Sequence, residues 1–154
     1  MDVSRVFQLT ASTTALAVAT MGLGSYVSKV GAGLACPDWP LCPLEADTLI
    51  LLEFSHRIIA FTTFLTGLAS FIASMKAPSY RGRKLVFIGF TILALQVFIV
   101  GALVIFTMLP PLVVAIHQAV AATIVAFYAA AATASYYAVG GKHKNRADNV
   151  ISHV

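Results

Sequence analysis

Residues 85–108 read LVFIGFTILALQVFIVGALVIFTM, an apolar run that holds no charged side chain. A helix that crosses a membrane needs about 20 predominantly apolar residues, because each residue adds about 1.5 Å and the hydrocarbon layer is about 30 Å thick. This run is long enough to cross a bilayer. A helix is favoured there because it satisfies its own backbone hydrogen bonds in lipid.

Three further apolar runs of similar length cover residues 6–28, 49–75 and 112–139. Of the 154 residues, 59% are hydrophobic and 10% are charged, and mean hydropathy is +0.88. Soluble domains are nearer half apolar and a quarter charged. The sequence therefore predicts an all-α membrane protein, a four-transmembrane-helix up-and-down bundle, in which residues 1–154 form a single domain.

Basic residues indicate the orientation of the bundle. They lie between the second and third runs and after the fourth: Lys76, Arg81, Arg83, Lys84, Lys142, Lys144 and Arg146. Cytoplasmic loops of membrane proteins carry an excess of lysine and arginine. We therefore expect a multi-pass protein of the cell membrane with both termini in the cytoplasm and the first connection outside. The net charge of +4 is then an orientation signal, and we expect no nucleic-acid partner.

The first connection, GLACPDWPLCPLEAD at residues 33–47, holds both cysteines of the chain, Cys36 and Cys42. On the oxidising side of the membrane, two thiols this close in a proline-rich loop are expected to form a disulfide. The spacing is C-x5-C, and disulfide exchange is typical of C-x-x-C. We therefore favour a structural bond that closes the loop over a redox-active pair.

Two histidines lie at matched depth inside the predicted spans. His56 in the second span and His117 in the fourth both lie roughly 8 to 10 Å below the outer surface, at about 1.5 Å per residue. In an up-and-down bundle these two spans are diagonal partners that run in the same direction, so the side chains can face each other. A single histidine would indicate an interhelical hydrogen bond. A matched pair favours axial ligation of a haem.

Charged and polar residues also occur inside the spans that hold or adjoin the two histidines. Glu53 lies one helical turn before His56 and four positions before Arg57, so two interpretations are open. Glu53 and Arg57 can form an internal ion pair, or Arg57 can bind a haem propionate while Glu53 accepts a proton beside the macrocycle. We expect the side chain of Gln96 to make a hydrogen bond between packed helices or to contact a residue that binds the ligand. The glycines and alanines of the first span indicate close helix packing.

At four stretches the chain resembles haem A synthase. These are GAGLACPDWPLC at 31–42, EFSHR at 53–57, residues 95–102 and IHQ at 116–118. The resemblance implies an oxidoreductase that converts the C8 methyl of haem O to a formyl group, giving haem A for terminal oxidases. It implies haem O as substrate, haem b as a further cofactor, and haem O synthase as a partner.

The resemblance also assigns roles to the residues above. It implies that His56 and His117 are the axial ligands of the haem iron, that Glu53 is the catalytic carboxylate, and that Cys36 and Cys42 are the outer-loop pair. Familiar members carry two four-helix halves, and this sequence holds one without an internal repeat. We therefore expect a homo-oligomer.

Two alternative functions are also considered. A non-catalytic bis-histidine b-type cytochrome, or a haem-carrying assembly factor for oxidases, would need both histidines and would leave Glu53 without a chemical role. A membrane thiol oxidoreductase would need a C-x-x-C motif or a second cysteine pair, and the sequence has neither.

Overall fold

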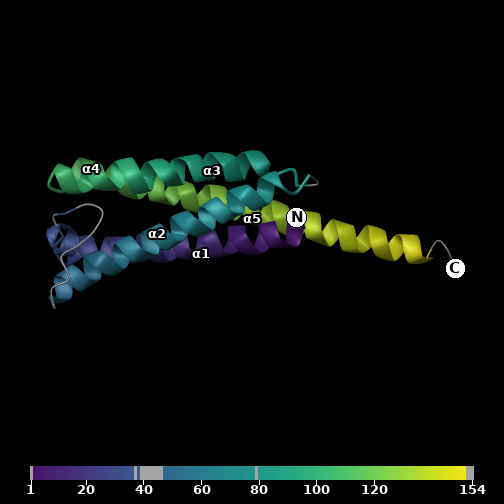
Figure 1. Cartoon of the computed structure of the whole chain (residues 1–154), viewed down its shortest axis with the longest axis horizontal. Coiled ribbons are helices and arrows are strands. Elements are labelled where there is room, and N and C mark those ends of the chain that lie inside the picture. Colours follow the sequence, from purple (N-terminus) through teal and green to yellow (C-terminus); the bar gives the residue numbers. More distant parts are fainter. Residues whose placement is uncertain (1, 37, 39–46, 79, 152–154) are drawn as a thin grey trace.

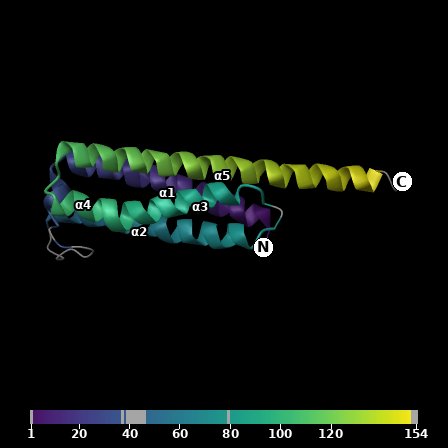
Figure 2. The ribbon, with the colours of Figure 1, turned by 90° about the horizontal axis from the view of Figure 1, so that it is seen from above.

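In the computed structural model, the described residues are 2–36, 38, 47–78 and 80–151, and from residue 141 onward only the backbone is described. They form helices and short connections without a strand. The elements are α1 (Val3–Lys29), η1 (Ala32–Leu34), α2 (Thr48–Met75), α3 (Arg83–Leu95), η2 (Gln96–Val100), α4 (Gly101–Phe106) and α5 (Pro111–Ile151). The long helices lie along one axis, and the end of α5 extends beyond the others (Figures 1 and 2).

Four helical segments are long and apolar enough to cross a membrane. They are Val3–Lys29, Thr48–Met75, Arg83–Phe106 and Pro111–Gly140, and the third combines α3, η2 and α4. Each predicted span agrees with one of these segments to within three residues at either end. The prediction of an all-α protein with the helices of a multi-pass membrane protein is therefore confirmed.

The contacts between helices give the order of the bundle. α1 packs against α2 and α5, and α3 packs against α5 and α2. Each of these helices therefore has two neighbours, and α2 and α5 lie on a diagonal. This is the relation that the sequence predicts for the second and fourth spans, and it places the segments that carry His56 and His117 across the bundle from each other.

Local signals in the sequence begin and end these helices. Asp2 caps α1 and Asp47 caps α2, each with a carboxylate that accepts backbone N–H bonds of the first turn. Pro111 begins α5, where the missing N–H costs nothing. Between α4 and α5, Met108 and Leu109 adopt left-handed backbone angles, with φ of 61° and 57°. The third span therefore ends at Phe106, slightly before the predicted Met108.

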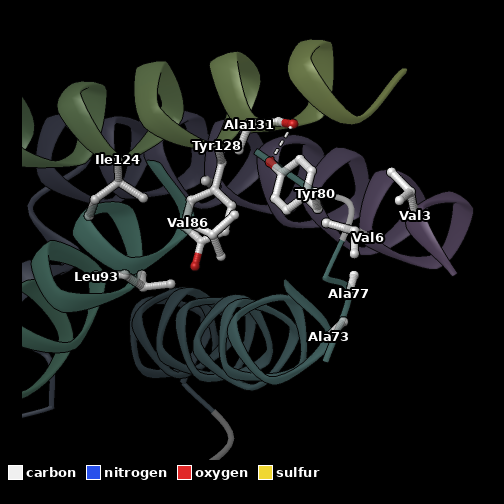
Figure 3. Close-up of a cluster of buried hydrophobic side chains, with 11 residues drawn as sticks. Val3, Val6, Ala73, Ala77, Tyr80, Val86, Leu93, Ile124, Tyr128 and Ala131 are labelled. Carbon is white, nitrogen blue, oxygen red and sulfur yellow. Dashed lines mark hydrogen bonds between the residues drawn. The ribbon is translucent and has the colours of Figure 1, made fainter. Parts of the chain in front are cut away.

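Most of the apolar core, whose side chains Figure 3 shows, lies in the half of the bundle away from the first connection. Tyr80, in the connection between α2 and α3, is buried there, and its hydroxyl donates a 2.9 Å bond to the carbonyl of Ala131 in α5. Burial raises the pKa of the Tyr80 phenol, so the phenol stays a donor. This bond ties the connection to the last helix.

Hydroxyl pairs join α1 and α2 toward the other half of the bundle. Thr13 lies 3.1 Å from Ser70, and Thr20 lies 3.0 Å from Thr63, oxygen to oxygen. Each threonine also donates to a carbonyl one turn earlier in its own helix. Such pairs allow close helix approach and satisfy the hydroxyls inside an apolar bundle. Beyond Thr20 and Thr63 the interior opens into a cavity.

Candidate functional site

A cavity of about 520 Å³ lies inside the bundle at the end near the first connection. α1, α2, α5 and the segment from α3 to α4 all contribute to its wall. Most of the lining side chains are apolar, and the polar ones include Glu53, His56, Arg57, Gln96 and His117. The cavity therefore collects the candidate site residues that the sequence singles out within the spans.

His56 and His117 enter this cavity from the diagonal helices α2 and α5. In each ring the Nδ1 atom is buried and has no hydrogen-bond partner among the described residues. Buried polar atoms are normally paired, so two unpaired ring nitrogens at one cavity indicate a site for a ligand that is not part of the chain.

A glycine makes room for the His56 ring. A Cβ atom at Gly24 of α1 would lie 2.7 Å from Cε1 of His56, closer than atoms pack. At Gly101, the first residue of α4, a Cβ would lie 4.0 Å from Cε1 of His117 and 3.2 Å from the carbonyl oxygen of Gln96. From the sequence, Gly24 is predicted only to allow close helix packing. Its role beside His56 depends on the rotation of α1 about its axis, which the sequence does not reveal.

Glu53 and Arg57 are paired with each other. The Nε atom of Arg57 donates a 2.9 Å bond to Oε1 of Glu53, and the side chains are 8% and 7% exposed for Arg57 and Glu53. Arg57 also donates through Nη2 to the carbonyl of Cys36 at 2.7 Å and through Nη1 to that of Asp38 at 2.5 Å. Of the two interpretations left open by the sequence, the internal ion pair is the one present here.

These bonds connect the cavity wall to the first connection. Arg57 reaches backbone carbonyls on the segment that follows η1, while its partner Glu53 lines the cavity. A guanidinium is suited to this because its donors are fixed in one plane and point in several directions. The position of the Glu53 carboxylate therefore depends on the fold of the first connection through Arg57.

The predicted disulfide involves a residue outside the described part of the chain. Cys36 is buried, and its sulfur lies 3.7 Å from the carbonyl oxygen of Ile50. Cys42 falls in residues 39–46, which are not described. The bond between Cys36 and Cys42 therefore stays a prediction.

Gln96 has a closer relation to His117 than the sequence reveals. Its Nε2 atom donates a 2.9 Å bond to the backbone carbonyl of His117, and its Oε1 atom is buried without a partner among the described residues. Gln96 begins η2, a π-helical turn that interrupts the third span. The sequence does mark Gln96 as a candidate, because it is a polar amide in the middle of an apolar span. Such a group is costly in lipid unless it forms hydrogen bonds or binds a ligand.

The chain is similar to curated heme A synthases. It is 34% identical to those of Bacillus mycoides and Bacillus anthracis over 92 residues, and 33% identical to that of Geobacillus kaustophilus over 96 residues. These matches cover 54 to 56% of this chain and 29% of each relative, so the matched part spans less than a third of their length. No family model and no solved structure matches the chain. The resemblance to heme A synthase is confirmed at this level.

Proposed function

We propose that this protein is a haem A synthase, a membrane oxidoreductase that binds haem between His56 and His117 and oxidises the C8 methyl of haem O to a formyl group. The observation that carries the proposal is that two imidazoles from diagonal helices, each with a buried Nδ1 atom, line one cavity. An imidazole from each side, bound through one ring nitrogen, suits axial ligation of an iron between them. The similarity to heme A synthases favours this chemistry over other uses of a bound haem.

The residues of the cavity fit a haem. The wall is largely apolar, which suits the macrocycle, and the missing side chain at Gly24 leaves space at the His56 imidazole. Bound haem supplies the redox chemistry. The chain would supply His56 and His117 as ligands, and the surrounding helices would exclude water from the site.

Glu53 is the residue that we propose for proton transfer. Oxidation of a methyl group to a formyl group adds one oxygen atom, from water, and releases protons and electrons, so a base beside the methyl would take up protons while an external acceptor takes the electrons. Glu53 lines the cavity one helical turn from His56, and Arg57 holds its Oε1 atom in a fixed position. We also propose Arg57 as a contact for a haem propionate, since a guanidinium has five N–H donors and can bond to a second carboxylate while it holds Glu53.

The partners follow from this assignment. We propose haem O as the substrate, haem b as a further cofactor, haem O synthase as the enzyme that supplies haem O, and a homo-oligomer in the lipid bilayer. We place the first connection outside the cell membrane and both termini in the cytoplasm, on the distribution of lysine and arginine.

The substitution Glu53→Gln tests the catalytic assignment, because it keeps the shape of the side chain and removes its charge. We expect the variant to bind haem and to accumulate haem O in place of haem A. Asp47→Asn is the matched control: it makes the same change at an exposed N-cap six residues earlier, where asparagine also caps a helix. Haem content and the ratio of haem A to haem O are measured on one preparation of each variant.

A purely structural role for Glu53 predicts the opposite pattern. The Gln variant would then have lower yield or stability, because Arg57 would lose its charged partner inside the bundle, with normal turnover per bound haem. Normal conversion to haem A in this variant would falsify the catalytic role.

The second candidate function is a non-catalytic b-type cytochrome or a haem-carrying oxidase assembly factor. The ion pair between Glu53 and Arg57 is the observation that favours it, since the pair has a structural use in holding the first connection. Extraction of the pigment from the purified protein discriminates between the two functions. An enzyme would yield haem O together with haem A, and a cytochrome would yield haem b alone.

A further inference from the structure

Gln96 lies at a break in the helix of the third span. α3 ends at Leu95, and residues Gln96–Val100 form a π-helical turn before α4 begins at Gly101. A π-helical turn holds an extra residue within a helix and occurs frequently at functional sites, because it changes the direction of the side chains around it. Here the turn places an amide side chain at the wall of the cavity, 93% removed from solvent.

The orientation of the Gln96 amide follows from its one hydrogen bond. Nε2 donates to the carbonyl oxygen of His117 at 2.9 Å. A carbonyl accepts and does not donate, so the nitrogen of the amide must face residue 117 and the oxygen Oε1 must face elsewhere. Oε1 is buried and has no partner among the described residues.

His117 presents the complementary unsatisfied group. Its Nδ1 atom is also buried without a partner in the described part of the chain. The bond from Gln96 to the backbone of residue 117 joins the two residues, and both of them line the cavity. An acceptor oxygen and a ring nitrogen, each costly to leave unpaired, therefore lie on neighbouring residues in space.

We propose that Gln96 is a positioning residue for His117, with Nε2 fixing the backbone of α5 and Oε1 accepting the N–H of the imidazole once the other ring nitrogen binds iron. The inference rests on the proposed haem site. A histidine that binds a metal through one nitrogen almost always donates the other N–H to an acceptor, which fixes the ring and raises its basicity as a ligand.

Several other polar groups at the cavity have hydrogen-bond partners of their own. Thr20 and Thr63 bond to each other and to their own helices, and Glu53 is held by Arg57. These groups belong to α1 and α2, the pair of helices that carries His56. Gln96 belongs to the segment that packs against α5, so it is placed to serve the other ring.

The test compares Gln96→Met with Gln96→Glu in the full-length protein carrying haem. Methionine keeps the size of the side chain and removes both the donor and the acceptor. Glutamate keeps an acceptor oxygen in either protonation state, and it lacks a donor for the His117 carbonyl when it is ionised. Thr91→Val is the control, because Thr91 is exposed on α3 and bonds only to Phe87 of its own helix. The measurement is the midpoint potential of the bound haem, with its low-spin electron paramagnetic resonance signal.

We expect Gln96→Met to raise the midpoint potential, because a less basic imidazole stabilises ferric iron less. Gln96→Glu should stay at the wild-type potential or fall below it, and Thr91→Val should equal wild type. A role limited to the bond with the His117 carbonyl predicts a different result, namely an upward shift for both Gln96 variants. That result, or a Met variant with the wild-type potential and signal, overturns the inference.

Loss of haem during purification is also informative. In that case haem is titrated into each apo-protein, and we expect the affinity of the Met variant to fall by about 10- to 100-fold, with Glu restoring it. Equal weakening of both variants counts against the proposal. Absence of a low-spin haem from the wild-type protein would refute the proposed function itself, whereas wild-type haem with unchanged variants refutes only the role of Gln96.

Discussion

Gly24→Ala is expected to weaken haem binding while leaving the helix that carries it intact. The new Cβ would lie 2.7 Å from Cε1, 3.2 Å from Nδ1 and 3.3 Å from Nε2 of His56. Carbon atoms pack at about 3.5 to 4.0 Å, so the ring must move by about 1 Å. The change therefore acts on the proposed ligand through one methyl group, without altering the histidine itself.

The size of the effect follows from the displacement of the ring. Moving a side chain about 30° from its preferred rotamer costs about 0.5 to 1.5 kcal/mol. Since 1.4 kcal/mol corresponds to a tenfold change in affinity, we expect the dissociation constant for haem to rise roughly twofold to tenfold. Stability of the apo-protein should not fall in parallel, because alanine is favoured over glycine inside a helix by about 0.5 to 1 kcal/mol.

Gly22→Ala provides the matched control. A Cβ at Gly22 would meet nothing within 4 Å among the described residues, and the position lies two residues earlier on the same helix. The assay is titration of haem into each apo-protein, followed by the absorbance of the Soret band, together with thermal unfolding. Haem binding by Gly24→Ala with the affinity and spectrum of Gly22→Ala would show that His56 does not bind the iron from this position.

Three further changes test other parts of the structure. His56→Ala or His117→Ala should abolish the low-spin haem spectrum, and a variant that keeps six-coordinate haem would contradict axial ligation by that residue. Cys36 and Cys42 should resist alkylation until a reductant is added, as followed by mass spectrometry; modification of both thiols without reductant would exclude the disulfide. Tyr80→Phe should lower the free energy of unfolding by about 0.5 to 1.5 kcal/mol through loss of its buried hydrogen bond, and unchanged stability would mean that this bond contributes nothing.

Hydropathy predicts the spans well because the bilayer imposes one length on all of them. It does not predict the π-helical turn at Gln96–Val100, since one extra residue inside a uniformly apolar run leaves composition unchanged. It also places the end of the last helix near residue 139, whereas α5 continues to Ile151. Hydropathy marks where a helix leaves the hydrocarbon layer, and helical backbone hydrogen bonds do not need to stop there.

The sequence predicts which residues meet at the cavity better than it predicts their partners. Depth along the axis depends only on residue counting, so the meeting of His56 and His117 could be anticipated. The partners of Arg57 could not, because two of its bonds go to backbone carbonyls whose positions depend on how the first connection folds. Spacing showed that Glu53 was within reach of Arg57, and it could not show that the same guanidinium also holds the connection.

The arrangement of these residues bears on how many bundles a haem site requires. Both proposed ligands, the proposed base and Gln96 line one cavity within a single four-helix bundle. The expected disulfide would join two residues of one connection of that same bundle. Each chain therefore holds a complete pair of imidazoles, and association with a second chain is not needed to bring them together. A homo-oligomer of this protein would place several such sites in one assembly. Each site would already have both of its imidazoles from one chain.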